Sequence, residues 1–188
     1  MVQAWMFKDG PESQYDPHKG ADVSLTELAE RGILYWCLDA DHHDTDPELA
    51  KIRKERGYKN FDIITISPAM PNFEDKMKIF FDEHLHDDEE IRMVLDGSGY
   101  FDVRGTDEVW IRVHVLKGDM IILPAGIYHR FSPDSNKYTK ALRLFQDEPK
   151  WIAYPRTQTE KEAPRPAREH YLKGFRLQKP ILATEIAA

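Results

Sequence analysis

Two kinds of hydrophobic pattern follow one another along this chain. In residues 1–83, apolar positions spaced three and four apart alternate with short, continuous apolar runs. Ser24 and Glu27 form a capping-box pattern, and Gly32 follows, so a helix is predicted between them. Further helices are predicted at residues 46–56, which open with Asp-Pro and end before a glycine, and at residues 73–82. Apolar runs rich in β-branched and aromatic residues predict strands at residues 33–38 and 61–66.

Short strands separated by turns dominate residues 84–154. Residues 96–99, with the sequence Asp-Gly-Ser-Gly, predict a hairpin turn between the first two strands. The predicted strands are residues 91–95, 100–103, 109–116, 120–123, 128–132 and 139–145. Many short strands with regular turn signals are typical of an antiparallel sandwich or a small barrel. The fold class predicted is therefore mainly β with a few helices.

The C-terminal part has a different composition. Residues 156–180 carry seven basic and three acidic side chains together with three prolines. With so little to bury, residues 155–188 are predicted to be a loose tail or a strap across the surface. Residues 1–154 are predicted to form one domain that includes the N-terminal helical elements.

Composition narrows the class of protein. The 188 residues have 26 basic and 33 acidic side chains, and the net charge of −7 argues against a nucleic-acid partner. A single cysteine, Cys37, lies in an apolar run and is predicted to be a buried thiol. From these residues we expect neither a signal peptide nor a membrane-spanning stretch. We expect a monomer in the cytoplasm, with nothing to exclude it from the nucleus.

Two histidine motifs provide the candidate chemistry. His84, His86 and Glu90, with Gly97 behind them, match H-x-H-x3-E-x6-G, and His129 ends the pattern G-x5-P-x-G-x2-H. Three imidazoles and a carboxylate suit a divalent transition metal such as Fe, Ni or Mn. A lone His-x-His pair is more often a surface feature, but the two complete motifs together favour a metal site. A structural zinc site would more often use cysteine ligands.

Residues near the motifs offer alternatives and further roles. Glu89 is the alternative carboxylate ligand if a bulge shifts the strand by one position, whereas Asp87 and Asp88 are expected in a solvated turn. The remaining histidines have no ligand spacing; they are His18, His42, His43, His114 and His170.

Strand parity places Arg92 on the same face as Glu90. There Arg92 would hold an anionic substrate, although an ion pair with a neighbouring carboxylate is the alternative. Phe131 follows His129 on its face, and with Phe80 or Val94 it would form an apolar wall of the pocket.

The two motifs resemble those of the cupin superfamily, a double-stranded β-helix or jelly-roll barrel with the metal inside. Pro133 stands where many cupins have an asparagine after the second motif. A closer resemblance, to eukaryotic-type acireductone dioxygenases, extends over about residues 1–154. It rests on the segments 35–41, 46–49, 81–86, 95–104 and 123–131.

This resemblance implies an enzyme of methionine salvage that cleaves the acireductone 1,2-dihydroxy-5-(methylthio)pent-1-en-3-one with O2. With Fe2+ the family forms 4-methylthio-2-oxobutanoate and formate; with Ni2+ it forms 3-(methylthio)propanoate, formate and CO. The resemblance assigns one ion per chain to His84, His86, Glu90 and His129, and substrate stabilisation to Arg92. Another cupin dioxygenase or isomerase, or a non-catalytic cupin binding module, remain the alternatives.

Overall fold

The computed structural model describes residues 2–175 apart from residues 11–12, 16, 18–19 and 150–151. Its strands, in chain order, are β1 (Gln3–Met6), β2 (Leu34–Cys37), β3 (Asn60–Ile66), β4 (His84–Leu85), β5 (Glu90–Arg104), β6 (Trp110–Leu116), β7 (Asp119–Leu123), β8 (Tyr128–Pro133), β9 (Thr139–Phe145) and β10 (Tyr154–Pro155). The helices are η1 (Ser13–Tyr15), α1 (Leu25–Ala29), α2 (Pro47–Arg56), α3 (Phe73–Phe81), α4 (Arg156–Thr159) and α5 (Pro166–Gly174).

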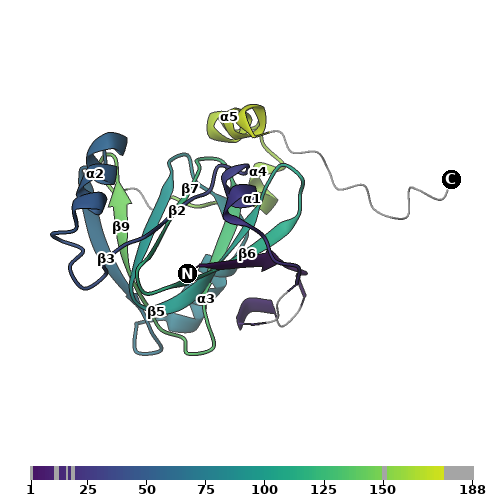
Figure 1. Cartoon of the computed structure of the whole chain (residues 1–188). Helices are drawn as coiled ribbons and strands as arrows, with labels where there is room; N and C mark the ends of the chain where they lie inside the picture. Colours follow the sequence, from purple (N-terminus) through teal and green to yellow (C-terminus); the bar gives the residue numbers. More distant parts are fainter. Residues whose placement is uncertain (1, 11–12, 16, 18–19, 150–151, 176–188) are drawn as a thin grey trace.

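The strands form two antiparallel layers joined through β5. One layer has the order β1-β6-β5-β8-β4-β10, and the other contains β2, β7, β9 and β3, with β7 and β9 each paired to β5 (Figure 1). The amino-terminal half of β5 pairs with β7 and β9, and its carboxyl-terminal half pairs with β6 and β8. This arrangement confirms the predicted mainly β, jelly-roll fold with a few helices.

The predicted hairpin turn at residues 96–99 is wrong. β5 runs without interruption through these residues, and its register against β9 shifts between Val94 and Asp96. Gly97 has φ +73°, and a Cβ there would lie 2.3 Å from the backbone oxygen of Tyr138. The bulge and the glycine thus let one long strand bend from one layer into the other.

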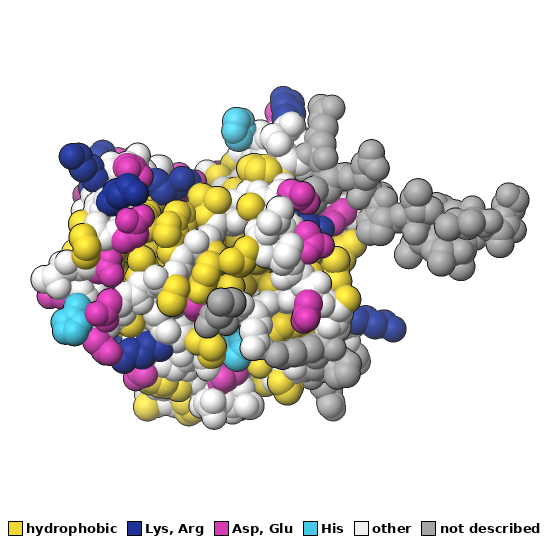
Figure 2. Space-filling view, viewed as in Figure 1, with side chains coloured by type: hydrophobic (Ala, Val, Ile, Leu, Met, Phe, Trp, Pro, Cys, Tyr) yellow, Lys and Arg dark blue, Asp and Glu magenta, His cyan; other side chains and the backbone are white. Residues whose placement is uncertain are grey.

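The helices follow the predicted end signals. The Ser24 hydroxyl oxygen accepts from the Glu27 backbone N–H, and the Glu27 carboxylate accepts from the Ser24 backbone N–H, so the predicted capping box starts α1. Asp46 caps α2, and Gly57 ends it in the left-handed conformation with φ +72°. Figure 2 shows Lys and Arg side chains gathered over α2, at the upper left of that face.

The prediction of a buried cysteine is wrong. Cys37 is exposed, because β2 is an edge strand that pairs with β7 alone. Alternation along β2 turns Leu34 and Trp36 toward the core cluster around α2, so Cys37 faces outward.

Helices α4 and α5 occupy residues 156–159 and 166–174, and they bury more than the composition of this segment suggests. Tyr171 is completely buried and belongs to the main core cluster, beside Leu28 of α1 and Ile127. Its hydroxyl donates to the backbone oxygen of Arg31 at 3.1 Å. Residues 176–188 of the predicted tail lie outside the described part. Within the described residues, no helix is both long enough and apolar enough to cross a membrane.

Candidate metal centre

Both layers of the barrel contribute to one cluster of side chains. His84 on β4 and His129 on β8 are register partners, and His86 follows β4 by one residue. Glu90 begins β5 in the opposite layer. The three histidines each offer a ring nitrogen within 4.8 Å of the others, and the Glu90 Oε2 lies 3.0 Å from His86 Nε2 and 3.4 Å from His129 Nε2. The four residues of the two motifs therefore converge, as their spacing predicts.

Backbone carbonyls orient all three rings. The Nδ1 atoms of His84, His86 and His129 lie 2.6, 2.6 and 3.1 Å from the backbone oxygens of Asp82, Ile152 and Ile127. A carbonyl oxygen only accepts, so each neutral ring carries its proton on Nδ1 and presents an unprotonated Nε2. This is the usual arrangement behind a metal-binding histidine.

Two further observations fit a cation here. His129 is 2% exposed, and its Nε2 has no hydrogen-bond partner among the described residues. A buried polar atom without a hydrogen-bond partner is costly in a folded protein. A cation bound between the three Nε2 atoms and the Glu90 carboxylate would give His129 Nε2 a partner. The donor set of three nitrogens and a carboxylate matches a divalent transition metal.

The protonation states suit metal ligands. Burial and the neighbouring His129 imidazole lower the pKa of His84 to about 3, so this ring is neutral at pH 7. Burial alone would raise the pKa of Glu90, but the charge of Arg92 and the electrostatic effect of the neighbouring His129 hold it well below its usual value. Burial would also lower the pKa of His86, yet the Glu90 carboxylate raises it. At neutral pH the site therefore contains an ionised carboxylate and a neutral His84.

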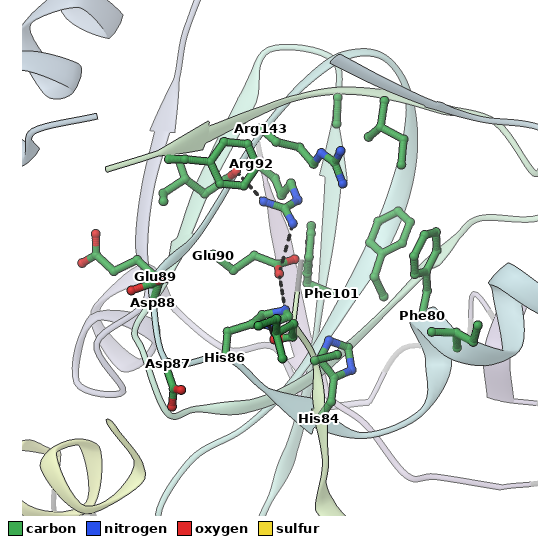
Figure 3. A pocket seen from close by; sticks show the side chains of 18 of the residues that line it. Phe80, His84, His86, Asp87, Asp88, Glu89, Glu90, Arg92, Phe101 and Arg143 are labelled. Carbon is green, nitrogen blue, oxygen red and sulfur yellow. Dashed lines mark hydrogen bonds and ion pairs between the residues drawn. The ribbon is translucent and has the colours of Figure 1, made fainter. Parts of the chain in front are cut away.

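The cluster opens into a cavity of about 540 Å3, large enough for a small organic ligand (Figure 3). The residues that the sequence analysis assigned to the pocket do line it: Arg92, Phe131, and both of the proposed partners of Phe131, Phe80 and Val94. The sequence did not point to Phe101, Arg143, Ile64, Ile66 and Ala141, which line the same cavity. The pairing of β5 with β9 and of β9 with β3 places most of these, and no local pattern reveals that pairing.

Two arginines lie side by side in the cavity, in different environments. Arg92 and Arg143 are register partners on β5 and β9. Arg143 makes two bonds to Asp62, at 2.7 and 2.6 Å. The Arg92 Nη2 lies 3.2 Å from Glu90 Oε2, and Figure 3 shows its guanidinium directed toward Glu90. Burial, together with the Arg143 charge, lowers the pKa of Arg92. Arg92 thus contacts the Glu90 carboxylate and also lines the cavity.

The acidic run beside Glu90 is directed away from the histidines. Glu89 accepts bonds from Tyr58 and Arg56, so it does not take the ligand position. Asp87 is held by Arg165 at 2.8 and 2.5 Å, and Asp88 is exposed. The register of β5 with β7 is continuous from Glu90 to Met93, so no bulge exchanges the two glutamates.

The other histidines do not join the cluster. His42 bonds to Asp39 on the surface, His114 packs against the Trp5 and Tyr100 rings, and His43 is bonded to the backbone of Ala40. His170 is exposed, and His18 lies outside the described residues.

Known proteins resemble this chain in sequence and in fold. The sequence model of the ARD/ARD' family matches residues 3–153. "Acireductone dioxygenase" from Homo sapiens is 56% identical over 160 residues, which cover 83% of this chain and 89% of that protein. "Acireductone dioxygenase 3" from Physcomitrium patens is 54% identical over 179 residues, covering 93% of this chain and 86% of that protein. A solved acireductone dioxygenase from Bacillus anthracis, with a cadmium ion in its active centre, superposes with a TM-score of 0.66 at 23% identity, over 81% of this chain and 97% of that one. The chain therefore belongs to the ARD/ARD' family, and its barrel is a cupin barrel.

Proposed function

We propose that this chain is a metal-dependent dioxygenase that cleaves 1,2-dihydroxy-5-(methylthio)pent-1-en-3-one with O2 in methionine salvage. With Fe2+ the products are 4-methylthio-2-oxobutanoate and formate; with Ni2+ they are 3-(methylthio)propanoate, formate and CO. In both cases the products together contain the atoms of the substrate and one O2, so no external reductant is needed. The observation that carries the proposal is the convergence of His84, His86, Glu90 and His129 next to the cavity that Arg92 lines.

The four converging side chains would hold one ion per chain. When bound, a divalent ion with two positions left open supplies a Lewis acid and a template for adjacent substrate oxygens. The backbone oxygens of Asp82, Ile152 and Ile127 keep the three imidazoles in the tautomer that presents Nε2. Relatives named acireductone dioxygenase, and the cadmium ion in the Bacillus anthracis structure, support this assignment.

Arg92 would stabilise the negative charge of the enediolate. Its side chain is 17% exposed and already pairs with Glu90, so a second anion placed beside it meets a desolvated, fixed guanidinium. A hydrogen bond to a charged group contributes about 1.5–3 kcal/mol in such surroundings. Arg92 and Glu90 are therefore the residues we assign to catalysis, the first toward substrate and the second as a ligand.

The apolar wall would bind the methylthio end of the substrate. Phe131, Phe80 and Val94 line the same cavity as the two arginines, and Phe131 packs against Phe101 with ring centroids 4.9 Å apart. Closely packed rings exclude water from that side of the cavity. A substrate with an anionic head and a short apolar tail matches this division of the pocket.

The direct test uses the metal-free protein loaded separately with Fe2+ and Ni2+, supplied with acireductone and O2. We expect formate from both forms and CO from the Ni2+ form alone. Consumption of O2 without either product would assign the site to another cupin dioxygenase. Tight binding of acireductone with no O2 consumption by either form would assign it to a non-catalytic binding module.

A further inference from the structure

Two adjacent glutamates of equal chemistry stand at the point where the chain enters β5. Glu90 points toward the histidines, and Glu89 points to the other side of the strand (Figure 3). An extra residue in the short segment after His86 would exchange their directions, because successive side chains of a strand face opposite sides. The metal centre thus depends on a choice between two neighbouring carboxylates.

The outward glutamate is held by two donors from a distant part of the chain. The Tyr58 hydroxyl donates to Glu89 Oε2 at 2.5 Å, and Arg56 Nη2 donates to Glu89 Oε1. Arg56 Nε also donates to the Tyr58 oxygen at 2.9 Å, which closes the set of three side chains. Glu89 and Arg56 are 23% and 32% exposed, so their bonds are partly screened from water.

The two donors are themselves firmly placed. Gly57 ends α2 in the left-handed conformation, which turns the chain between Arg56 and Tyr58. The Tyr58 ring is 3% exposed and belongs to the core cluster under α2. The backbone oxygen of Arg56 accepts from Gln146 Nε2 at 3.0 Å. The donors therefore hold Glu89 against a rigid part of the fold.

We propose that Arg56 and Tyr58 are positioning residues that keep Glu89 outside the metal centre and thereby present Glu90 to His84, His86 and His129. Moving Glu89 inward breaks two charge-assisted bonds and leaves the buried Tyr58 hydroxyl without its acceptor. The inference rests on the proposed function only for the presence of a divalent ion at these ligands.

The test is a Ni2+ titration of the full-length chain by competition with a chelator, which requires no turnover. In Arg56→Met/Tyr58→Phe, we expect the Kd for Ni2+ to rise about 10-fold or more, the size of effect that outer partners of metal ligands show. Arg53→Met is the matched control. Arg53 belongs to the same helix, but its guanidinium packs over the Phe61 ring and does not bond to Glu89. Its Kd should stay within about twofold of the original, as expected for a surface change.

Adding Glu90→Gln separates positioning from a general loss of structure. In the original chain this substitution removes tight binding, because Glu89 stays tied to its donors. In Arg56→Met/Tyr58→Phe the further loss should be smaller, because Glu89 is released to compete for the same place, so the two effects are not additive. Additive effects, an unchanged Kd in the double variant, or an equal rise in Arg53→Met would each overturn the proposal.

Tyr58→Phe alone removes one oxygen, leaves the core intact, and should shift the Kd in the same direction by less. Failure of turnover with these Ni2+ affinities intact would contradict the proposed function and not this inference.

Discussion

The two ends of β5 each contain a buried carboxylate next to arginine, and they are used in opposite ways. Glu90 lies at the open end, in the cavity with His84, His86 and Arg92. Asp102, twelve positions further on, lies at the closed end and is 1% exposed.

At the closed end the polar groups are paired with one another. Asp102 accepts from Arg112 at 2.6 and 2.8 Å and from Arg130 Nε at 2.9 Å. Arg130 Nη2 also donates to Asp9 Oδ1 at 2.8 Å, and its guanidinium lies 3.9 Å from the centre of the Phe81 ring. Both arginines are thus covered by carboxylates and aromatic rings.

At the open end one ligand atom has no such partner. His129 Nε2 is buried and has no hydrogen-bond partner in the part of the chain that the structure describes. A single oxygen, Glu90 Oε2, lies 3.0 Å from His86 Nε2, 3.2 Å from Arg92 Nη2 and 3.4 Å from His129 Nε2. Completed pairing indicates a structural network, and convergent, incomplete pairing beside a cavity indicates a site for a ligand. Four experiments separate these two roles.

The largest expected effect is on activity at the open end. His129→Ala should abolish both stoichiometric metal binding and turnover, because it removes a buried ligand from a set of four. The apo-protein should stay folded but unfold at a lower urea concentration, because the variant loses the packing of a buried ring and the Nδ1 bond to Ile127, although no Nε2 bond is lost among the described residues. Metal analysis after dialysis, together with urea unfolding, tests both statements. Full metal content in the variant would contradict the ligand assignment.

A large effect on stability is expected at the closed end. Asp102→Ala leaves the buried Arg112 and part of Arg130 without their carboxylate, which costs about 3–5 kcal/mol of unfolding free energy. The measurement is urea unfolding of the metal-free chain, with Asp102→Asn as the variant of matched shape. The fraction that remains folded should still bind one ion. A loss below about 1 kcal/mol would remove the contrast between the two ends, since this is the range of an exposed ion pair.

A smaller effect is expected for Arg92→Ala, which changes the open end without touching its histidines. The metal should stay bound, while kcat/KM falls by about 10- to 100-fold, as loss of about 1.5–3 kcal/mol of charge-assisted bonding implies. Steady-state kinetics with metal content measured on the same sample checks this. Unchanged kcat/KM would return Arg92 to the role of an ion-pair partner for Glu90.

The most gradual effect is a dependence of stability on pH. The folded chain holds the pKa of His84 at about 3, by burial and by the His129 imidazole, against an ordinary value of 6.5. Between these values the unfolded chain binds a proton at His84 that the folded chain does not. The unfolding free energy of the metal-free protein should therefore fall as the pH falls through this window, by at most about 1.4 kcal/mol per pH unit from this residue.

Urea unfolding at pH 4, 5 and 6 measures that dependence. His84→Phe keeps a ring of similar size without the titrating nitrogen, so its unfolding free energy should change less with pH than that of the original chain. Parallel pH profiles for the two proteins would show that His84 titrates normally in the fold.

Sequence periodicity was reliable where one segment decides the outcome. The even spacing of Glu90, Arg92 and Val94 sets their common face, since a regular strand alternates its sides. Capping residues located α1 and α2 for the same local reason. The errors arose where a distant partner decides. The strand can bend at Gly97 because a glycine leaves room for the backbone of Tyr138 in the neighbouring segment. Tyr171 is buried because it packs in a core cluster with residues of α1 and with Ile127.

The sequence by itself determined the four candidate ligands, the arginine beside them and the β-rich fold class, because these follow from residue type and from spacing within single segments. Only the tertiary structure decided which other side chains surround these candidate ligands. It brought Arg143 opposite Arg92, placed Phe101 in the cavity and set Arg56 and Tyr58 against Glu89. The physical reason is that a strand's own pattern sets the direction of its side chains, whereas the pairing of strands and helices far apart in the chain sets what those side chains meet.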